Sequence, residues 1–497
     1  MHWKSNLISF LIGLLTAISS IAQEGTYYFK DSTIVGKGEM IDTYKEGVWE
    51  LYNTVTQNTQ IGKFKENIRD GLWKYYDKDD HKILEVTYEG GIMHGRYKTF
   101  FQNGNVHLTG EIEDTLKTGI WKEYYPNGNL KATGNFSDGY RGGTWKYNRD
   151  NGLPSIEATY EYDTLHGPYK EFDDLGETKV QGIYNHGEKE GNWIEMGKNG
   201  YAIKEEKYKN GVLDGKSVEY HEFGSVKAEK NYKEGKAAGK WTYYYVNNQK
   251  QNEMTFEDGK LEGAYNEYHP NGKLSVVGKY IIGKRVGVWK NYYETGVLYT
   301  FGPYLDGVKD GLWKYFNEYG YLSSEGTFKN GLEDGQWFFY YDNDSIESIG
   351  SFSGGKQDGL WGLFYRDGNL KQEETWEEGK LMTLTDVYFK DDTLSCGEFE
   401  NGNGLRITYQ SNKSIESKAK YENGIQNGAM EIFLKDGTLS GMGTIKDGIR
   451  DGTWTFYHPN GVVESKGLYE QGKLIYIWKF YNKNGRLIRE INYSALK

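Results

Sequence analysis

The chain has 497 residues, of which 60 are Lys or Arg and 71 are Asp or Glu, so its formal net charge is −11. This acidic balance disfavours nucleic acid and anionic membrane surfaces as partners. A single cysteine excludes an intrachain disulfide framework, and no shift in composition marks a second domain.

Residues 1–22 have the pattern of a secretory signal peptide. Lys4 lies near the start, an apolar run extends from Leu7 to Ile21, and small residues precede Gln23. This pattern predicts cleavage after Ala22 and export as a soluble periplasmic, cell-surface or secreted protein. The alternative is an uncleaved membrane anchor.

A 24-residue repeat begins at Gly47 and continues for most of the chain. Its leading glycine recurs in register as far as Gly359, and resumes three residues out of phase at Gly404. Twelve of the 14 tryptophans stand two residues after this glycine or its equivalent. A turn, a second Gly-x-aromatic pair and a second turn complete the unit, as in residues 311–334. We count about 19 units.

Each unit is predicted to form two β-strands. Asn-Gly and Asp-Gly turns supply the positive φ of tight hairpins, and the segments between them are short and rich in aromatic residues. In Gly-x-Trp the glycine and the ring share one face of a regular strand, and the bare glycine leaves room for a ring from the neighbouring strand. A flat sheet of this many strands is unusual. We therefore predict an all-β fold, an elongated array of two-stranded β-hairpin repeats that forms a coiled antiparallel meander.

The register divides the chain into five predicted parts. In one of them Thr383 and Thr385 replace the glycine and the tryptophan, and this part contains the only cysteine, Cys396. It is predicted to be a degenerate unit or a kink, with an interaction site as the alternative. The parts are the signal peptide 1–22, an N-terminal cap or degenerate unit 23–46, regular repeats 47–382, the irregular unit 383–403, and repeats with a C-terminal cap 404–497.

The repeated tryptophans are the candidate structural or binding aromatics. One interpretation is that their rings pack on neighbouring strands, and the other is that a row of rings is exposed and binds protein or sugar. The lysines that follow many of them are predicted to face solvent. The candidates are Trp73, Trp121, Trp145, Trp193, Trp241, Trp289, Trp313, Trp337, Trp361 and Trp454.

No catalytic pattern is present in the sequence. It lacks HExxH, GxSxG, a Walker loop and a dinucleotide fingerprint. The acidic turns at Asp77–Asp80 and Asp342–Asp344 lack the glycine and distal glutamate of an EF-hand loop. We predict a non-enzymatic protein with no cofactor and no catalytic, metal or cofactor-binding residues, with weak Ca²⁺ contacts in acidic turns as the alternative.

The repeat resembles MORN repeats, and more closely the bacterial MORN variant of YwqK-type antitoxin proteins. The matching residues have the form YxNGxxxGxWxxYYxNGxL, as in Phe328 to Leu332 continuing into Asp334 to Trp337 and Tyr340-Tyr341. The resemblance implies hairpin arrays that serve as protein-interaction or lipid-associated modules, and an antitoxin that neutralises a partner toxin. Trp follows the leading glycine where better-known MORN repeats have Gly-x-Gly, so lipid binding is not carried over.

These observations predict an exported, non-enzymatic repeat scaffold that binds another protein, toxin-like by the resemblance, on an extended face. Because the chain is predicted to be exported, we do not expect it to neutralise a cytoplasmic toxin. The alternative function is a cell-envelope glycan-binding protein that uses exposed Trp/Tyr rows.

Overall fold

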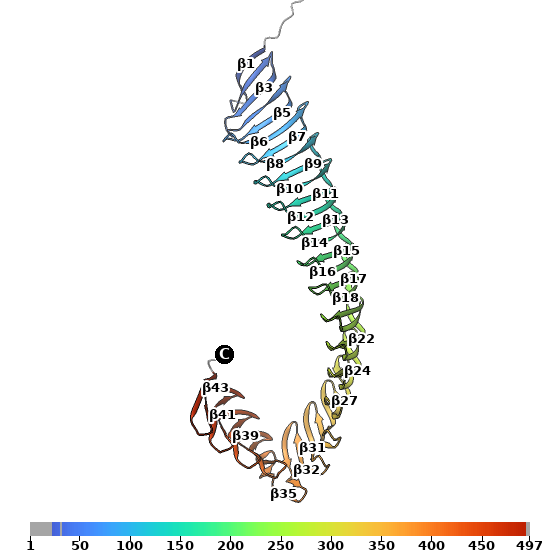
Figure 1. The fold of residues 1–497 in the computed structure, drawn as a ribbon, viewed down its shortest axis with the longest axis vertical. Coiled ribbons are helices and arrows are strands. Elements are labelled where there is room, and N and C mark those ends of the chain that lie inside the picture. Colours follow the sequence, from blue (N-terminus) through green and yellow to red (C-terminus); the bar gives the residue numbers. More distant parts are fainter. Residues whose placement is uncertain (1–21, 30–31, 494–497) are drawn as a thin grey trace, which may run out of the picture. The chain divides into compact units, whose positions relative to one another are not determined.

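The computed structural model describes residues 22–29 and 32–493, which form antiparallel β-strands joined by tight turns (Figure 1). The predicted signal peptide lies outside these residues except for Ala22. Among the described residues, no helix is long and apolar enough to cross a membrane. The chain divides into two compact units, with the boundary between Lys236 and Ala237.

The first unit is an antiparallel meander in which consecutive strands pair. Its strands are β1 (Ala22–Phe29), β2 (Ile34–Ile41), β3 (Tyr44–Asn53), β4 (Thr59–Lys65), β5 (Ile68–Tyr76), β6 (Lys82–Glu89), β7 (Ile92–Phe100), β8 (Val106–Glu113), β9 (Leu116–Tyr124), β10 (Leu130–Ser137), β11 (Tyr140–Asn148), β12 (Pro154–Glu161), β13 (Thr164–Phe172), β14 (Thr178–Asn185), β15 (Glu188–Met196), β16 (Ala202–Lys209), β17 (Val212–Tyr220) and β18 (Val226–Lys233). The short β19 (Lys236–Ala237) spans the boundary in the sequence.

The second unit continues the same hairpin pattern. Its strands are β20 (Gly239–Tyr244), β21 (Lys250–Glu257), β22 (Lys260–Tyr268), β23 (Leu274–Ile281), β24 (Lys284–Tyr292), β25 (Leu298–Leu305), β26 (Val308–Lys309), β27 (Gly311–Phe316), β28 (Leu322–Lys329), β29 (Leu332–Tyr340), β30 (Ile346–Ser353), β31 (Lys356–Phe364), β32 (Leu370–Glu377), β33 (Lys380–Leu384), β34 (Val387–Phe389), β35 (Asp392–Leu394), β36 (Phe399–Glu400), β37 (Asn403–Tyr409), β38 (Ile415–Glu422), β39 (Ile425–Phe433), β40 (Leu439–Lys446), β41 (Ile449–Tyr457), β42 (Val463–Glu470), β43 (Lys473–Tyr481) and β44 (Leu487–Asn492). Strands β34 and β35 pair only with each other, and β36 to β44 form a separate sheet. The prediction of an all-β array of hairpin repeats is confirmed.

The tryptophan of a typical unit covers a glycine of the preceding strand. A Cβ added to Gly326 would lie 2.1 Å from the ring of Trp337, its partner in the register. The space that glycine was predicted to leave for a neighbouring ring is therefore present, and the indole ring fills it. The same contact recurs in the pairs Gly38–Trp49, Gly62–Trp73, Gly110–Trp121, Gly134–Trp145, Gly182–Trp193, Gly278–Trp289, Gly302–Trp313, Gly350–Trp361, Gly443–Trp454 and Gly467–Trp478.

Units that lack this glycine have a smaller or more flexible residue in place of the tryptophan. The facing pairs are Val86–Tyr97, Ala158–Tyr169, Glu206–Ser217, Met254–Tyr265 and Ala419–Met430. Trp241 departs from this rule, because Lys230 occupies the glycine position of the preceding strand, and Trp241 is only partly buried. In the described units a fully buried indole therefore occurs where the facing residue is glycine or is otherwise displaced, and a facing side chain usually goes with a smaller or more flexible residue in place of tryptophan.

In most of these pairs the indole N–H gives tryptophan an advantage over phenylalanine as the covering ring, although the buried Nε1 of Trp289 has no hydrogen-bond partner among the described residues. Trp337 Nε1 donates to the carbonyl oxygen of Thr327 over 3.1 Å, and Trp313 Nε1 donates to that of Pro303 over 3.0 Å. Thr327 lies where the register between β28 and β29 shifts. Trp337 is 4% exposed, so its indole N–H would cost about 1–3 kcal/mol if it were left without this acceptor. The indole ring therefore fills the space over the glycine, and its N–H pairs with a backbone carbonyl at the bulge.

The leading glycine has a different role from the one predicted. We expected it to lie with the tryptophan on one face of a regular strand, but leading glycines have positive φ, +101° at Gly311 and +80° at Gly335. The strand is bulged there, which interrupts the alternation of side chains. A Cβ at the equivalent Gly143 would meet nothing within 4 Å. Backbone conformation, not space, therefore favours glycine at this position.

Candidate functional site

Nine of the ten candidate tryptophans are buried, with exposed fractions of at most 7%. Trp337 packs edge-on against Phe328 and Phe352, with ring centroids 5.3 and 5.9 Å apart. In several units a cation lies over the indole, as Lys309 does at 4.3 Å from the Trp313 ring. The structure thus brings these rings together as the core of the array, and a binding surface has to be sought elsewhere.

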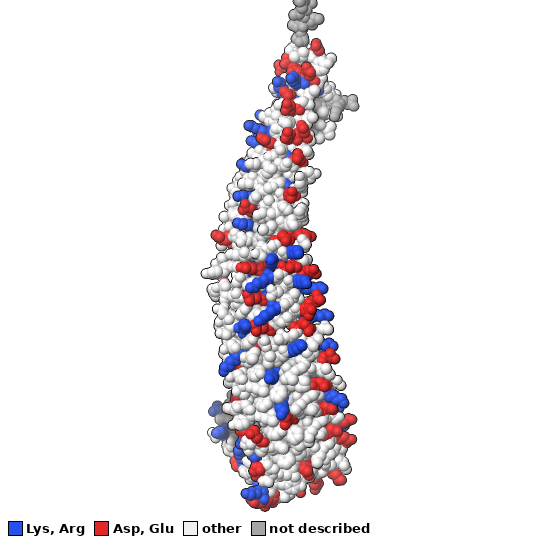
Figure 2. Space-filling view, turned by 90° about the vertical axis from the view of Figure 1, so that its right-hand side faces the viewer, with Lys and Arg blue, Asp and Glu red and all other residues white. Residues whose placement is uncertain are grey.

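Charged side chains of both signs are interspersed on the face shown in Figure 2. Lys314, which follows Trp313, forms an ion pair with Glu325 on the next strand at 2.7 Å. Lys146 follows Trp145 and lies 3.7 Å from Glu157, with 64% of its side chain exposed. These lysines belong to cross-strand ion pairs at the surface.

The regular repeat is interrupted between β33 and β37, within residues 383–403. Two backbone hydrogen bonds connect β33 with the chain beyond the interruption. They run from Leu381 N to Gly424 O (3.1 Å) and from Gly402 N to Met382 O (2.8 Å). Leu381 and Val387 are buried at 0% and 2% exposure. The interruption is therefore a packed junction that holds the small β34–β35 hairpin.

A cleft of about 920 Å³ opens at this junction. One wall is the turn after β31, another is the end of β34, and Ser411 lies in the turn after β37. Such a volume accommodates a small molecule or several side chains of a partner. The lining residues are Tyr365, Arg366, Asp367, Asn369, Leu370, Tyr388, Phe389, Lys390 and Ser411.

A hydrogen bond between successive turns that several other units form is missing at the cleft. In those units the residue six after the leading glycine donates to a carbonyl 23 residues later, as Tyr293 Oη does to Phe316 O at 3.0 Å. Tyr365 occupies this position, but within residues 22–29 and 32–493 its buried hydroxyl has no hydrogen-bond partner. The carbonyl expected by the spacing is that of Tyr388, which belongs to β34. Displacement of this strand therefore opens the cleft.

Tyr365→Phe is expected to leave stability unchanged or to raise it by up to about 1 kcal/mol, because it removes an unpaired buried hydroxyl. Burial also raises the pKa of this hydroxyl. Tyr293→Phe, which removes a hydroxyl that donates to a backbone carbonyl, should instead cost about 1 kcal/mol. Urea unfolding of both variants measures the difference. An equal loss in the two variants would show that Tyr365 is paired in solution.

Aromatic and charged groups meet in the cleft and directly beside it, where Tyr409 and Lys413 contact Phe389. The Phe389 ring lies 5.8 Å from that of Tyr365 and 6.3 Å, edge-on, from that of Tyr409. Lys413 Nζ is 5.7 Å from the Phe389 ring. Tyr388 is 36% exposed. Rings with polar ends beside charges of both signs are typical of protein recognition surfaces.

A charged pair links the strands on either side of the junction. Arg406 in β37 forms an ion pair with Glu374 in β32, and their side chains are only 17% and 6% exposed. Trp376 Nε1 also donates to Glu374 Oε2 at 3.0 Å. The pair fixes the strands around which the cleft is formed.

Cys396 also lies in the junction and is buried. Burial, and then the charge of Asp386, raise the pKa of its thiol. A thiol of this kind is a poor nucleophile at neutral pH. Cys396 therefore packs in the junction and does not supply a reactive group to the cleft.

Sequence reasoning identified the irregular segment 383–403 but missed the turn residues that complete the cleft. Tyr365 and Ser411 lie in units that look regular in the sequence. A signal was available in the 23-residue spacing between hydrogen-bonded turns. The unit after Tyr365 is three residues short, so the carbonyl at this spacing is not expected to lie in its usual place.

Fold and junction together define an all-β repeat scaffold. The family model of the MORN repeat variant matches seven segments, residues 117–138, 213–234, 261–281, 285–305, 333–353, 450–471 and 477–495. These matches support a MORN-repeat protein, as the glycine and aromatic pattern predicted. MORN repeats suggest a scaffold for protein or membrane interaction, and MORN-repeat proteins are generally non-enzymatic. No curated protein matches the chain significantly.

Proposed function

We propose that this protein is an exported, non-enzymatic MORN-repeat scaffold that binds a partner protein at the junction cleft. The observation that carries the proposal is the interruption of an otherwise uniform array by an open, partly aromatic cavity of about 920 Å³. Regular units bury nearly all of their tryptophan rings, whereas the ring of Tyr388 lines this cleft and is 36% exposed. Binding residues commonly lie where a rigid scaffold carries an irregular segment.

A protein ligand fits this cleft better than a neutral glycan. The lining combines Tyr388 and Phe389 with the charged groups of Arg366, Asp367 and Lys390. A partner with charges of both signs can form ion pairs with these groups, whereas a neutral sugar can only hydrogen-bond to them. Burial of nine of the ten candidate tryptophans leaves the glycan hypothesis dependent on tyrosines, which gives it less support.

We further propose a class for the partner protein and a compartment in which it is bound. Resemblance to the YwqK-type variant supports a toxin-like partner protein. The signal-peptide pattern of residues 1–22 supports binding of this partner outside the cytoplasm. The partner would then be an exported or envelope-associated protein held by the scaffold.

The proposal is tested by affinity capture with residues 23–497 as bait and a detergent extract of the native envelope as prey. Tyr388→Ala should weaken retention of a stoichiometric partner about 10-fold or more, because an exposed tyrosine in a cleft is a typical binding hot spot. Tyr319→Ala is the matched control, since Tyr319 is a 77% exposed turn tyrosine outside the cleft lining. Equal retention by both variants would place the binding surface elsewhere and contradict the proposal.

A further inference from the structure

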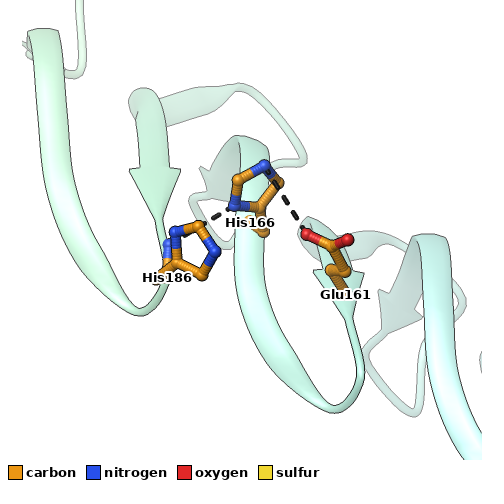
Figure 3. A group of neighbouring side chains, drawn as sticks. All are labelled: Glu161, His166 and His186. Carbon is orange, nitrogen blue, oxygen red and sulfur yellow. Dashed lines mark hydrogen bonds and ion pairs between the residues drawn. The ribbon is translucent and has the colours of Figure 1, made fainter.

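Two histidines and a glutamate come together at the turns of adjacent hairpins in the first unit (Figure 3). Glu161 ends β12, His166 lies in β13 and His186 follows β14. Their ligand atoms all lie within 4.8 Å of one another. His166 Nε2 is 3.8 Å from Glu161 Oε2, and the two imidazole rings have centroids 4.8 Å apart.

The repeat explains why these residues meet. The residue before the leading glycine normally carries an oxygen acceptor for the backbone N–H of the turn 20 residues later, and His166 occupies this position. His186 N donates to His166 Nδ1, but over a long 3.4 Å. The imidazole thus replaces a carboxylate without improving the contact. Regular examples are Asn210 N to Glu190 Oε2 at 2.9 Å and Ile282 N to Glu262 Oε2 at 2.8 Å.

We propose that Glu161, His166 and His186 form a binding site for a late first-row divalent metal ion of the Zn²⁺ class. Two imidazoles and one carboxylate are a ligand set that suits Zn²⁺ and leaves a fourth position open. Metal–ligand bonds of about 2.0–2.2 Å require ligand atoms about 3.4 Å apart. Small side-chain rotations suffice to bring the three groups to this spacing.

Exposure of the side chains makes these rotations easy. Glu161 and His166 are 53% and 39% exposed, so neither is locked by packing. Coordination through either nitrogen of His166 ends the contact from His186 N, because Nδ1 then holds the metal or a proton. That contact is long and partly solvated, so its loss costs little. The open fourth position faces solvent, where water or a side chain of another molecule can reach it.

The chain contains a natural control three units earlier. Glu89, His94 and Asp114 occupy the same repeat positions, and His94 lies 3.8 Å from each of the two carboxylates. This set has the same layout and only one imidazole. An aspartate in place of the second histidine makes the set harder and less suited to Zn²⁺. The second histidine, His186, is therefore the residue on which selective binding depends.

The experiment is a calorimetric titration of Zn²⁺ into residues 23–497 without a polyhistidine tag, with Co²⁺ absorption as a probe of coordination. His186→Asn removes the second imidazole and copies Asn210, which has the same φ of +48° in the next unit, so the fold is preserved. His94→Asp is the matched control and copies Asp70 of the preceding unit.

We expect one Zn²⁺ bound per chain with micromolar affinity, weakened about 10-fold or more by His186→Asn and unchanged by His94→Asp. Bound Co²⁺ should show the intense visible bands of a four-coordinate site. The inference is overturned if Zn²⁺ does not bind, or if His186→Asn leaves its affinity unchanged. An equal loss in His94→Asp would also overturn it, because the effect would then not be specific to the His166–His186 pair.

Discussion

Gly326→Val is expected to destabilise the repeats around it by about 3 kcal/mol, the upper end of the usual cost of overpacking a core. An added Cβ would lie 2.1 Å from the Trp337 ring, which is 4% exposed and has no space to retreat within its packed row. Displacing the ring also breaks the hydrogen bond from Trp337 Nε1 to Thr327 O. Hydrogen exchange of β28 and β29, together with urea unfolding, measures the loss.

Two further variants separate this effect from the backbone cost of losing a glycine. Gly326→Val combined with Trp337→Tyr copies the natural pair Val86–Tyr97 and should recover most of the stability. Gly143→Ala, at φ +65° with nothing within 4 Å of the added Cβ, should cost only about 1–2 kcal/mol. If Gly326→Val is no worse than Gly143→Ala, the ring does not need the space over the glycine.

Arg406→Met is expected to destabilise the junction by about 3–5 kcal/mol. It leaves the Glu374 carboxylate, which is 6% exposed, buried without its cationic partner. Adding Glu374→Gln removes the stranded charge and should recover much of the loss. Thermal unfolding and the hydrogen exchange of β32 and β37 report the change.

A solvent-exposed ion pair in the same compact unit, residues 237–497, provides the control for this prediction. Lys479 and Glu490 lie 3.2 Å apart with side chains 45% and 44% exposed. Lys479→Met should therefore cost less than about 1 kcal/mol. Equal effects of Arg406→Met and Lys479→Met would mean that the junction pair does not hold the two sheets together.

The hairpin array could be predicted because its determinants are local. Turn glycines recur every 24 residues and the segments between them are short and aromatic, so the strands follow from spacing alone. The bulge could not be predicted, since Gly-x-Trp has the spacing of a regular strand and the positive φ of Gly335 depends on pairing with β28. The side that forms the core was equally hidden, because Trp337 and Tyr340 are both aromatic and three residues apart. Gly326, on the preceding strand, decides between them.

The two candidate sites show the same limit. Residues 383–403 were recognisable as irregular, but the cleft also needs Tyr365 and Ser411, whose own units are regular. His166 and His186 are 20 residues apart, and only the repeat register places them at adjacent turns. The recurrence of histidine directly before the leading glycine, at His94 and His166, was the signal in the sequence.

The most direct test of the central claim is hydrogen exchange of residues 23–497 with and without the captured partner. Binding at the junction cleft predicts slower exchange in peptides that cover residues 365–370, 387–394 and 409–414, with little change in the regular repeats. Protection confined to the regular repeats, with these three segments unchanged, would contradict the claim.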